Sequence, residues 1–336
     1  MFENVTPAQV DAVLGAMTTV VDHDGADGAG GGRQMVEAAA AIMFGTPRDL
    51  GADPVVPVAP DGLAAAVGDD PTLAAHAVEL VAVAALADGR VESDRLRCVL
   101  EYADLLGVRE DWTEVLADVA EGRTEKAMAH MVRSNAATFP GLAGPDGMPE
   151  MLCYSGRSDA DKRVLDRFEG LEGYAPGTFG HAFWVHFRRH GFRFPGQEGA
   201  FNGAFAVPHD GLHVLSGYDT SMQGELLVST FTGEMHGVEA LSAHLLPVIF
   251  EWHIGQEVNG IGAQHGALDP WKFLYAWRRG NATAVDVLDT RWRFFDVAER
   301  PLEEVRSRYG IPELPDRFRA TGPEVNFTEE ADPSVT

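Results

Sequence analysis

The chain is poor in cysteine and in basic residues, and each shortage excludes a class of protein. Only two cysteines, Cys98 and Cys153, occur among 336 residues, and they lie far apart in the sequence. They make neither a disulfide framework nor a closely spaced metal-binding pair, and they suit a reducing compartment. The 26 lysines and arginines are outnumbered by 51 aspartates and glutamates, so the net charge of −25 opposes binding to nucleic acid.

Targeting segments and long apolar runs are also missing. Residues 1–11 contain neither the basic region nor the apolar run of a secretory signal. The most membrane-like stretch, 238–254, includes Glu239, His244, Pro247 and Glu251, so we expect a buried or groove-lining helix there and no membrane span. We find no phosphate-binding glycine loop and no nucleophile elbow. These absences favour a cytoplasmic globular protein.

The first part of the chain has the apolar periodicity of helices. Residues 75–86 and 93–106 are predicted helices, and Gly89 and Gly107 stand where left-handed caps would end them. A similar pattern over 10–21 and 34–44 ends at Gly45, which suggests a duplicated helical hairpin.

An acidic run between the first two predicted helices resembles a calcium loop. It reads Asp22-x-Asp24-Gly25-x-Asp27. Its glycine is at the wrong offset for an EF-hand, and Arg33 stands where the bidentate glutamate is needed. We therefore interpret it as an acidic, glycine-rich connection between helices.

Composition divides the rest of the chain. Residues 138–176 are interrupted by Pro140, Pro145, Pro149 and Pro176 and are predicted to be a linker. Most aromatic residues and histidines follow in 177–312, and the polar, acidic segment 316–336 is predicted to be a disordered tail. We expect an all-α protein with two helical domains, over 1–137 and 150–315.

The densest group of metal-binding residue types is His-Asp-Gly-Leu-His at 209–213. At about 100° per residue, His209, Asp210 and His213 fall within an arc of about 100° on one helix face. Neutral imidazole and carboxylate are ligands of zinc, iron and manganese. The motif predicts a divalent-metal site. The alternative is a set of polar groups on the outer faces of helices.

Glu225 is the candidate fourth ligand, although it would lie about 18 Å beyond His213 on one continuous helix. Pro208 suits the first turn of a helix and Gly217 suits its end, so we expect a short helix over 208–216. A turn at 217–220 and a second helix from about Ser221 would bring Glu225 back toward the first helix. The sequence thus predicts a helix hairpin whose second arm completes the site.

Two resemblances to known families accompany these patterns. The phrase Ala-Val-Ala-Ala-Leu-Ala-Asp-Gly-Arg-Val-Glu at 82–92, with Leu-Leu-Gly at 105–107, resembles the tellurite-resistance TerB-like helical domain. The spacing of His-Asp-x-x-His, eleven residues and Glu over 209–225 resembles the ubiquinone (coenzyme Q) biosynthesis family of the Coq-four type. Similar flanks are Gly-Thr-Phe-Gly at 177–180, Ala-Trp-Arg-Arg-Gly at 276–280, Pro-Leu-Glu-Glu-Val-Arg at 301–306 and Tyr-Gly-Ile at 309–311.

The second resemblance implies a function. It implies one divalent metal, zinc in that family, held by His209, Asp210, His213 and Glu225 beside an apolar groove for a prenylated quinone precursor. The implied reaction is oxidative decarboxylation of the aromatic head group, in association with other quinone-biosynthesis proteins. Zinc has no redox chemistry, so iron or manganese stays open. Two alternatives also stay open: a prenyl-lipid-binding scaffold with a structural metal, and a metal hydrolase acting on another lipid.

Two further features bear on a lipid ligand. Apolar residues from 179 to 252 are candidates for the groove, although most would serve equally as core: Phe179, Phe183, Trp184, Phe187, Leu226, Phe231, Leu245, Leu246, Ile249, Phe250 and Trp252. Residues 183–194 interleave aromatics with three arginines, a composition typical of a peripheral membrane contact. The alternative is a helix end whose arginines pair with acids. His181, His186 and His190 are interpreted as surface or groove residues because no acidic partner is evident.

Overall fold

The computed structural model describes residues 2, 5–23, 31–68, 70–260 and 262–322, and this part of the chain is all-helical. The described residues contain three isolated β-bridges and no β-strand. The predicted all-α class is confirmed. Within the described ranges, none of the helices combines the length and the apolar character that crossing a membrane requires. Most of the acidic run at 22–27 lies outside the described residues.

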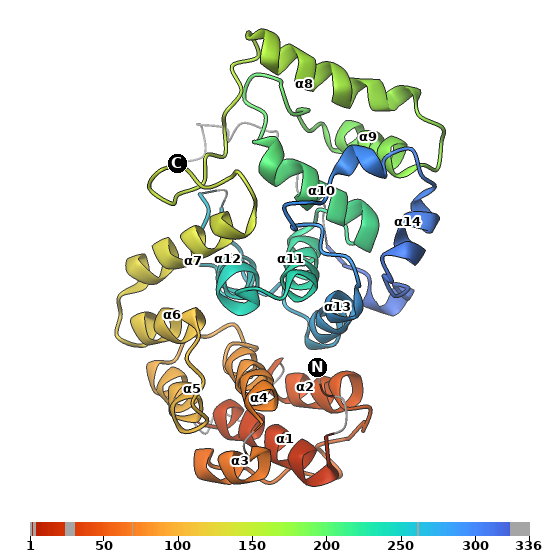
Figure 1. Cartoon of the computed structure of the whole chain (residues 1–336). Helices are drawn as coiled ribbons and strands as arrows, with labels where there is room; N and C mark the ends of the chain where they lie inside the picture. The colour runs from red at the N-terminus through yellow and green to blue at the C-terminus, as the bar shows by residue number, and fades with distance from the viewer. Residues whose placement is uncertain (1, 3–4, 24–30, 69, 261, 323–336) are drawn as a thin grey trace.

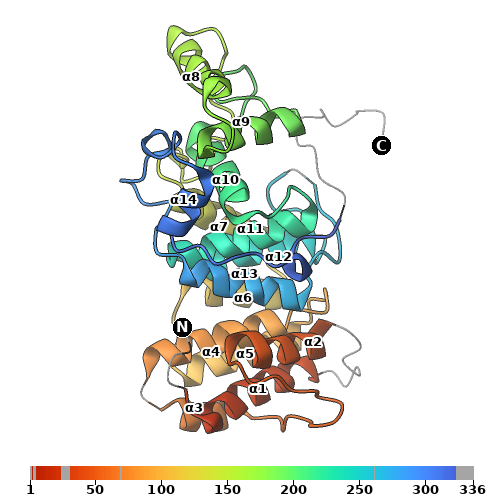
Figure 2. The same ribbon diagram turned by 90° about the vertical axis from the view of Figure 1, so that its right-hand side faces the viewer.

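The N-terminal helices form one end of the molecule (Figures 1 and 2). They are α1 (Pro7–Val21), α2 (Gly31–Ala38), the π-helical turn η1 (Ala39–Met43), α3 (Pro60–Val67), α4 (Pro71–Ala84) and α5 (Ser93–Leu105). A capping box between Thr6 and Gln9 begins α1. Gly107, with a φ of 70°, follows the end of α5 in the left-handed conformation as predicted. The prediction is wrong for α4, which ends at Ala84, because Gly89, with a φ of 76°, lies in the turns that follow the helix.

The middle of the molecule is built around α11 (Figure 2). Its elements are α6 (Asp111–Ala120), α7 (Thr124–Thr138), α11 (Met222–His236), the π-helical turn η3 (Ala240–Leu245), α12 (Leu246–Trp252) and α13 (Pro270–Ala282). Most side chains of α11 are buried, because α13, η3 and α12 pack around it. Residues 241–253 are buried as expected, whereas Val238 and Glu239 at the start of the segment are exposed.

The other end contains α8 (Asp159–Glu169), α9 (Phe179–His190), α10 (Gly203–Ser216) and α14 (Leu302–Arg308), with the short turns η2 (Gly170–Gly173) and η4 (Phe294–Asp296). The turn η5 (Asp316–Phe318) packs on α13 in the middle of the molecule. The prediction of a linker over 138–176 is wrong where α8 forms. Ser158 caps α8 by accepting a hydrogen bond from the Asp161 N–H, and Phe168 anchors it to Phe183 in the core. Prolines bound this helix without interrupting it.

Contacts link residues 1–137, the first predicted domain, to the rest of the chain. The Arg278 guanidinium on α13 donates a hydrogen bond to the Ile42 carbonyl at 3.2 Å, and Asn135 on α7 donates one to the Ala243 carbonyl at 2.8 Å. His253 lies 3.2 Å from the Ala87 carbonyl through Nε2. Buried side chains from both parts belong to one hydrophobic cluster. The division into domains at 1–137 and 150–315 therefore stays a prediction.

The start of the predicted disordered tail is packed on the molecule. Phe318 is buried and stacks on Tyr275 with ring centroids 3.9 Å apart. The Thr321 N–H donates a hydrogen bond to Gln223 on α11 at 2.9 Å. The prediction is thus wrong for residues 316–322, because one apolar side chain in a polar segment is enough to anchor it. Residues 323–336 lie outside the described part of the chain.

Candidate metal centre

The predicted helix hairpin is present in α10 and α11. Gly217 ends α10 in the left-handed conformation with a φ of 81°, and Ser221 caps α11 by accepting a hydrogen bond from the Gly224 N–H at 3.0 Å. Glu225 consequently lies in the first turn of α11, facing α10. One boundary differs from the prediction: α10 begins at Gly203 after the Asn202 cap, so Pro208 lies inside the helix.

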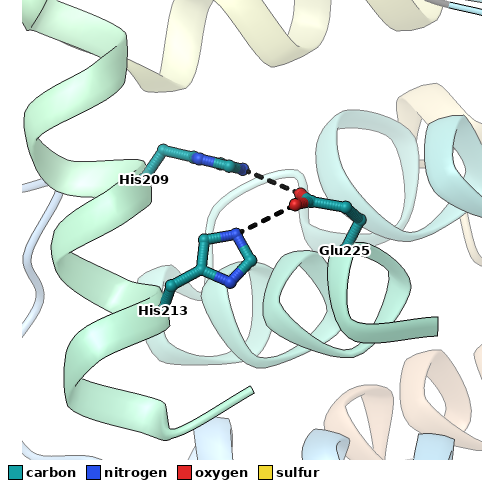
Figure 3. Close-up of side chains that lie close together, drawn as sticks. All are labelled: His209, His213 and Glu225. Carbon is teal, nitrogen blue, oxygen red and sulfur yellow. Dashed lines mark ion pairs between the residues drawn. The ribbon is translucent and has the colours of Figure 1, made fainter. Parts of the chain in front are cut away.

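His209, His213 and Glu225 come together at this hairpin (Figure 3). The Nε2 atom of His209 lies 3.3 Å from Glu225 Oε2, and the Nε2 atom of His213 lies 3.2 Å from Glu225 Oε1. One ligand atom from each residue falls within 4.8 Å of the others. A tetrahedral zinc site with bonds of about 2.1 Å separates its ligand atoms by about 3.4 Å, so the three residues are close to the spacing such a site needs.

Two buried atoms of this cluster make no hydrogen bond. They are His213 Nε2 and Glu225 Oε1. His213 Nδ1 lies 3.0 Å from the Tyr218 carbonyl, an acceptor, so Nδ1 carries a proton and Nε2 faces the cluster. Nε2 lies 3.2 Å from a carboxylate oxygen, and this pairing is satisfied either by a second proton on the ring or by a metal cation between the two atoms. The residues therefore fit a divalent metal.

Asp210 lies beside this cluster with its carboxylate engaged elsewhere. Its Oδ1 atom is 3.0 Å from His186 Nε2 on α9, and its Oδ2 atom is 3.9 Å from His209 Nδ1. The structure thus brings together three of the four predicted ligands, and the assignment of Asp210 as a ligand stays a prediction.

The expectation that His186 has no acidic partner is wrong. Asp210 is that partner, and the His186 ring also stacks on His213 with centroids 5.6 Å apart. The contact depends on how α9 packs on α10, so neither helix's own sequence periodicity reveals it.

The charges of the clustered side chains shift one another's pKa values. Burial favours the neutral forms, yet the pKa of Glu225 is lowered to about 2 because the imidazoles of His213 and His209 stabilise its charge. The pKa of Asp210 is likewise lowered by His186 and His209 despite burial. Burial opposes protonation of His209, but Asp210 and Glu225 raise its pKa to about 10. The carboxylates are therefore held ionised, which is the form that binds a metal, whereas His209 must release a proton before it can bind one.

The cluster lies at a cavity of about 650 Å³, a size that suits a small organic ligand. His209, Asp210 and Glu225 contribute to its wall. Most of the remaining lining is apolar and comes from the segments around 132–152, 187–206 and 258: Val132, Met148, Pro149, Met151, Leu152, Phe187, Phe192, Ala200, Phe201, Phe205, Ala206 and Val258. Asn135, Arg193, Gly199 and Asn259 complete it.

The predicted groove residues are mostly elsewhere. Of the eleven candidates, only Phe187 lines this cavity. Phe179, Phe183 and Phe231, for example, are fully buried in the hydrophobic core. The cavity wall comes instead from residues such as Met148 and Met151, which belong to the segment predicted to be a linker. Long-range packing, which no local pattern reports, decides which apolar side chains face the cavity.

Comparison of the chain with protein-family models, with curated proteins and with solved structures gives no match. The resemblances to the quinone-biosynthesis and TerB-like families therefore stay predictions from the sequence motifs.

Proposed function

We propose that this protein binds one divalent metal and acts on the aromatic head group of a prenylated quinone precursor, by metal-assisted oxidative decarboxylation. The observation that carries the proposal is the cluster of His209, His213 and Glu225, with its unpartnered buried atoms, at the wall of an apolar cavity. The cluster would hold the metal, and the apolar wall would hold the body of the lipid.

The residues present define what each part would do. A metal bound by two histidines and one glutamate supplies a Lewis acid that stabilises negative charge on a phenolate or carboxylate. The Tyr218 carbonyl orients His213, and the apolar lining excludes water from the bound head group. We take dioxygen as the oxidant that an oxidative decarboxylation consumes. This ligand set occurs with zinc and also with iron, and the redox requirement favours iron or manganese over zinc.

A non-catalytic lipid scaffold with a structural metal is the second candidate. Structural zinc sites are closed by four protein ligands, whereas catalytic sites keep a position open. Here three residues form the cluster while Asp210 contacts His186, and this arrangement favours a position open to the cavity. Conversion of a 3-prenyl-4-hydroxybenzoate to a decarboxylated product by the purified protein would eliminate the scaffold.

We further propose peripheral contact with a membrane from a cytoplasmic location, in association with other quinone-biosynthesis proteins. Val185 on α9 and Leu152 at the cavity wall are exposed apolar residues with exposed fractions of 42% and 65%. Arg188 and Arg189 are exposed on α9 near Val185. Apolar and cationic side chains together suit the surface of an anionic bilayer.

Metal content tests the proposal directly. We expect close to one equivalent of a transition metal per chain, measured by elemental mass spectrometry on protein purified without added metal. His213→Ala should lose most of it, because it removes a buried ligand. His265→Ala changes an exposed histidine outside the cluster and should keep the metal. Less than about a tenth of an equivalent in the unaltered protein, with no further loss in His213→Ala, would end the proposal.

A further inference from the structure

The cavity contains one cationic side chain whose role the metal centre does not explain. Arg193 follows α9, is exposed to solvent, and contributes to the cavity wall. Within the described part of the chain, its guanidinium has neither an acidic partner nor a hydrogen-bond acceptor. The nearest acid along the chain, Glu198, is paired instead with Arg157 at 3.7 Å. Acidic residues outnumber basic ones by 51 to 26 in this protein, yet no described acid pairs with this arginine at the cavity.

The backbone around Arg193 is fixed on both sides. The Phe192 N–H donates a hydrogen bond to the Phe187 carbonyl at 2.9 Å, and the Phe194 N–H donates one to Gln197 at 2.8 Å. The Phe194 ring stacks on Phe187 with centroids 5.0 Å apart. The backbone that carries the arginine is therefore held in place, so ligand binding would have to order only its side chain.

A glycine makes room for the guanidinium. Gly199 also lines the cavity, and a Cβ atom at this position would lie 2.4 Å from Arg193 Nη1. Gly199 has a φ of 73°, so its conformation also favours glycine. The guanidinium thus lies against bare backbone at the cavity, where a side chain would displace it.

The cavity consequently has two polar regions on a mainly apolar wall: the histidine–glutamate cluster and Arg193. The planar guanidinium binds carboxylate and phosphate through two parallel hydrogen bonds. We propose that Arg193 selects the ligand of this cavity by pairing with an anionic group, carboxylate or phosphate, on an otherwise apolar molecule. This inference rests on the proposed function, since it assigns a specificity-determining residue to the same cavity.

Binding of three probes with the same twelve-carbon chain tests the proposal: dodecanoate, dodecyl phosphate and dodecan-1-ol, below their micellar concentrations, by titration calorimetry. Each is measured with the protein as purified and after chelator treatment, so that a metal cannot supply the preference for an anion. We expect at least one anionic probe to bind about tenfold or more tightly than the alcohol, since a hydrogen-bonded charge contributes about that much. The stronger of the two anions identifies the group recognised.

Variants of Arg193 test whether this residue causes the preference for anionic probes. Arg193→Gln should reduce the preference for the anion to less than about threefold while leaving dodecan-1-ol binding unchanged. Arg193→Lys should restore part of it, because charge remains but the planar fork is lost. Arg188→Gln is the matched control: it removes one exposed positive charge from α9 that does not line the cavity, and it should keep the full preference.

The outcomes separate the two proposals. If the alcohol binds as tightly as both anions, or if Arg193→Gln keeps the preference, the role of Arg193 is wrong while the cavity remains a ligand site. If none of the three probes binds the unaltered protein in either condition, the lipid-binding function fails, and the role of Arg193 fails with it.

Discussion

At the scale of single residues, the candidate centre depends on groups that hold its ligands in one protonation state and one orientation. The Tyr218 carbonyl fixes the proton of His213 on Nδ1, so Nε2 is directed at Glu225. Asp210 lies between His186 and the Nδ1 side of His209. A carboxylate behind a metal-binding histidine raises its basicity and orients its ring. Asp210 can therefore support the centre without binding the metal itself.

Removal of His186 tests this role of Asp210. In His186→Ala, the Asp210 carboxylate loses its partner at 3.0 Å and is free to turn. If Asp210 orients His209, we expect metal affinity to fall by about 10- to 100-fold, as is typical when outer partners of metal ligands are removed. Competition with a chromogenic chelator measures this affinity.

The control for this variant is His181→Ala, which removes another partly buried histidine of the same helix whose ring neighbour is Trp184. Its metal affinity should equal that of the unaltered protein. An affinity that rises in His186→Ala would contradict the orienting role, because it would mean that the released Asp210 joins the metal as a ligand.

At the scale of helices, the position of Glu225 depends on α11, and α11 depends on its close contact with α13. The contact is close because Gly280 on α13 has no side chain: a Cβ atom there would lie 2.3 Å from the Phe231 carbonyl oxygen and 2.8 Å from Glu234 Cβ. Backbone atoms cannot yield as a flexible side chain can. This glycine therefore sets how near the two helices approach.

We expect Gly280→Ala to destabilise the protein. The added methyl group forces α11 and α13 apart, and overpacking of this kind typically costs about 1–3 kcal/mol, more than the gain in helix propensity of about 0.5–1 kcal/mol. Urea denaturation followed by circular dichroism measures the change in the free energy of unfolding.

Gly170→Ala is the matched control for this substitution. Gly170 has a φ of −60° and no atom within 4 Å of an added Cβ, so its replacement should be neutral or slightly stabilising. Equal stabilities for Gly280→Ala and the unaltered protein would show that the helices shift apart at no cost.

The same scale explains which predictions from the sequence succeeded. The ends of α10 and α11 were predictable because Gly217 and Ser221 act on their own backbone neighbours, and the short turn between them brings Glu225 back. The contact of His186 with Asp210 was not predictable, since it arises from the packing of α9 on α10. The place of Met151 in the cavity wall was not predictable either, since a segment outside the helices brings it there by long-range packing. The helix α8 was missed because flanking prolines were interpreted as interruptions within it.

At the scale of the whole molecule, the many acids include two at least partly buried carboxyls that form no ion pair within the described residues. Glu79 on α4 is partly buried, and its pKa is raised to about 8 by burial and by the charge of Glu110. Glu234 on α11 is buried and has a pKa raised by burial and by Glu79. The N-terminal helices and α11 therefore interact through two carboxyls that favour the protonated form.

The sign of the resulting pH dependence follows from this shift. A carboxyl with a pKa near 4.5 in the unfolded chain and about 8 in the folded protein binds its proton more tightly when folded. Its contribution to stability is complete below about pH 4.5 and is lost as the pH rises to about 8. For Glu79 the loss is on the order of 5 kcal/mol over this interval. Glu79→Gln cannot ionise, so the variant should lose less stability than the unaltered protein between pH 5 and 8.

Urea denaturation at several pH values from 5 to 9 measures the difference between the two curves. The metal-centre carboxylates, whose pKa values are lowered, are common to both proteins and do not affect that difference. Glu169→Gln removes an exposed acid of α8 and should give a curve parallel to that of the unaltered protein. Parallel curves for Glu79→Gln as well would mean that Glu79 ionises in the folded protein as readily as in the unfolded chain. The charge of Glu79 would then contribute nothing to the pH dependence of stability.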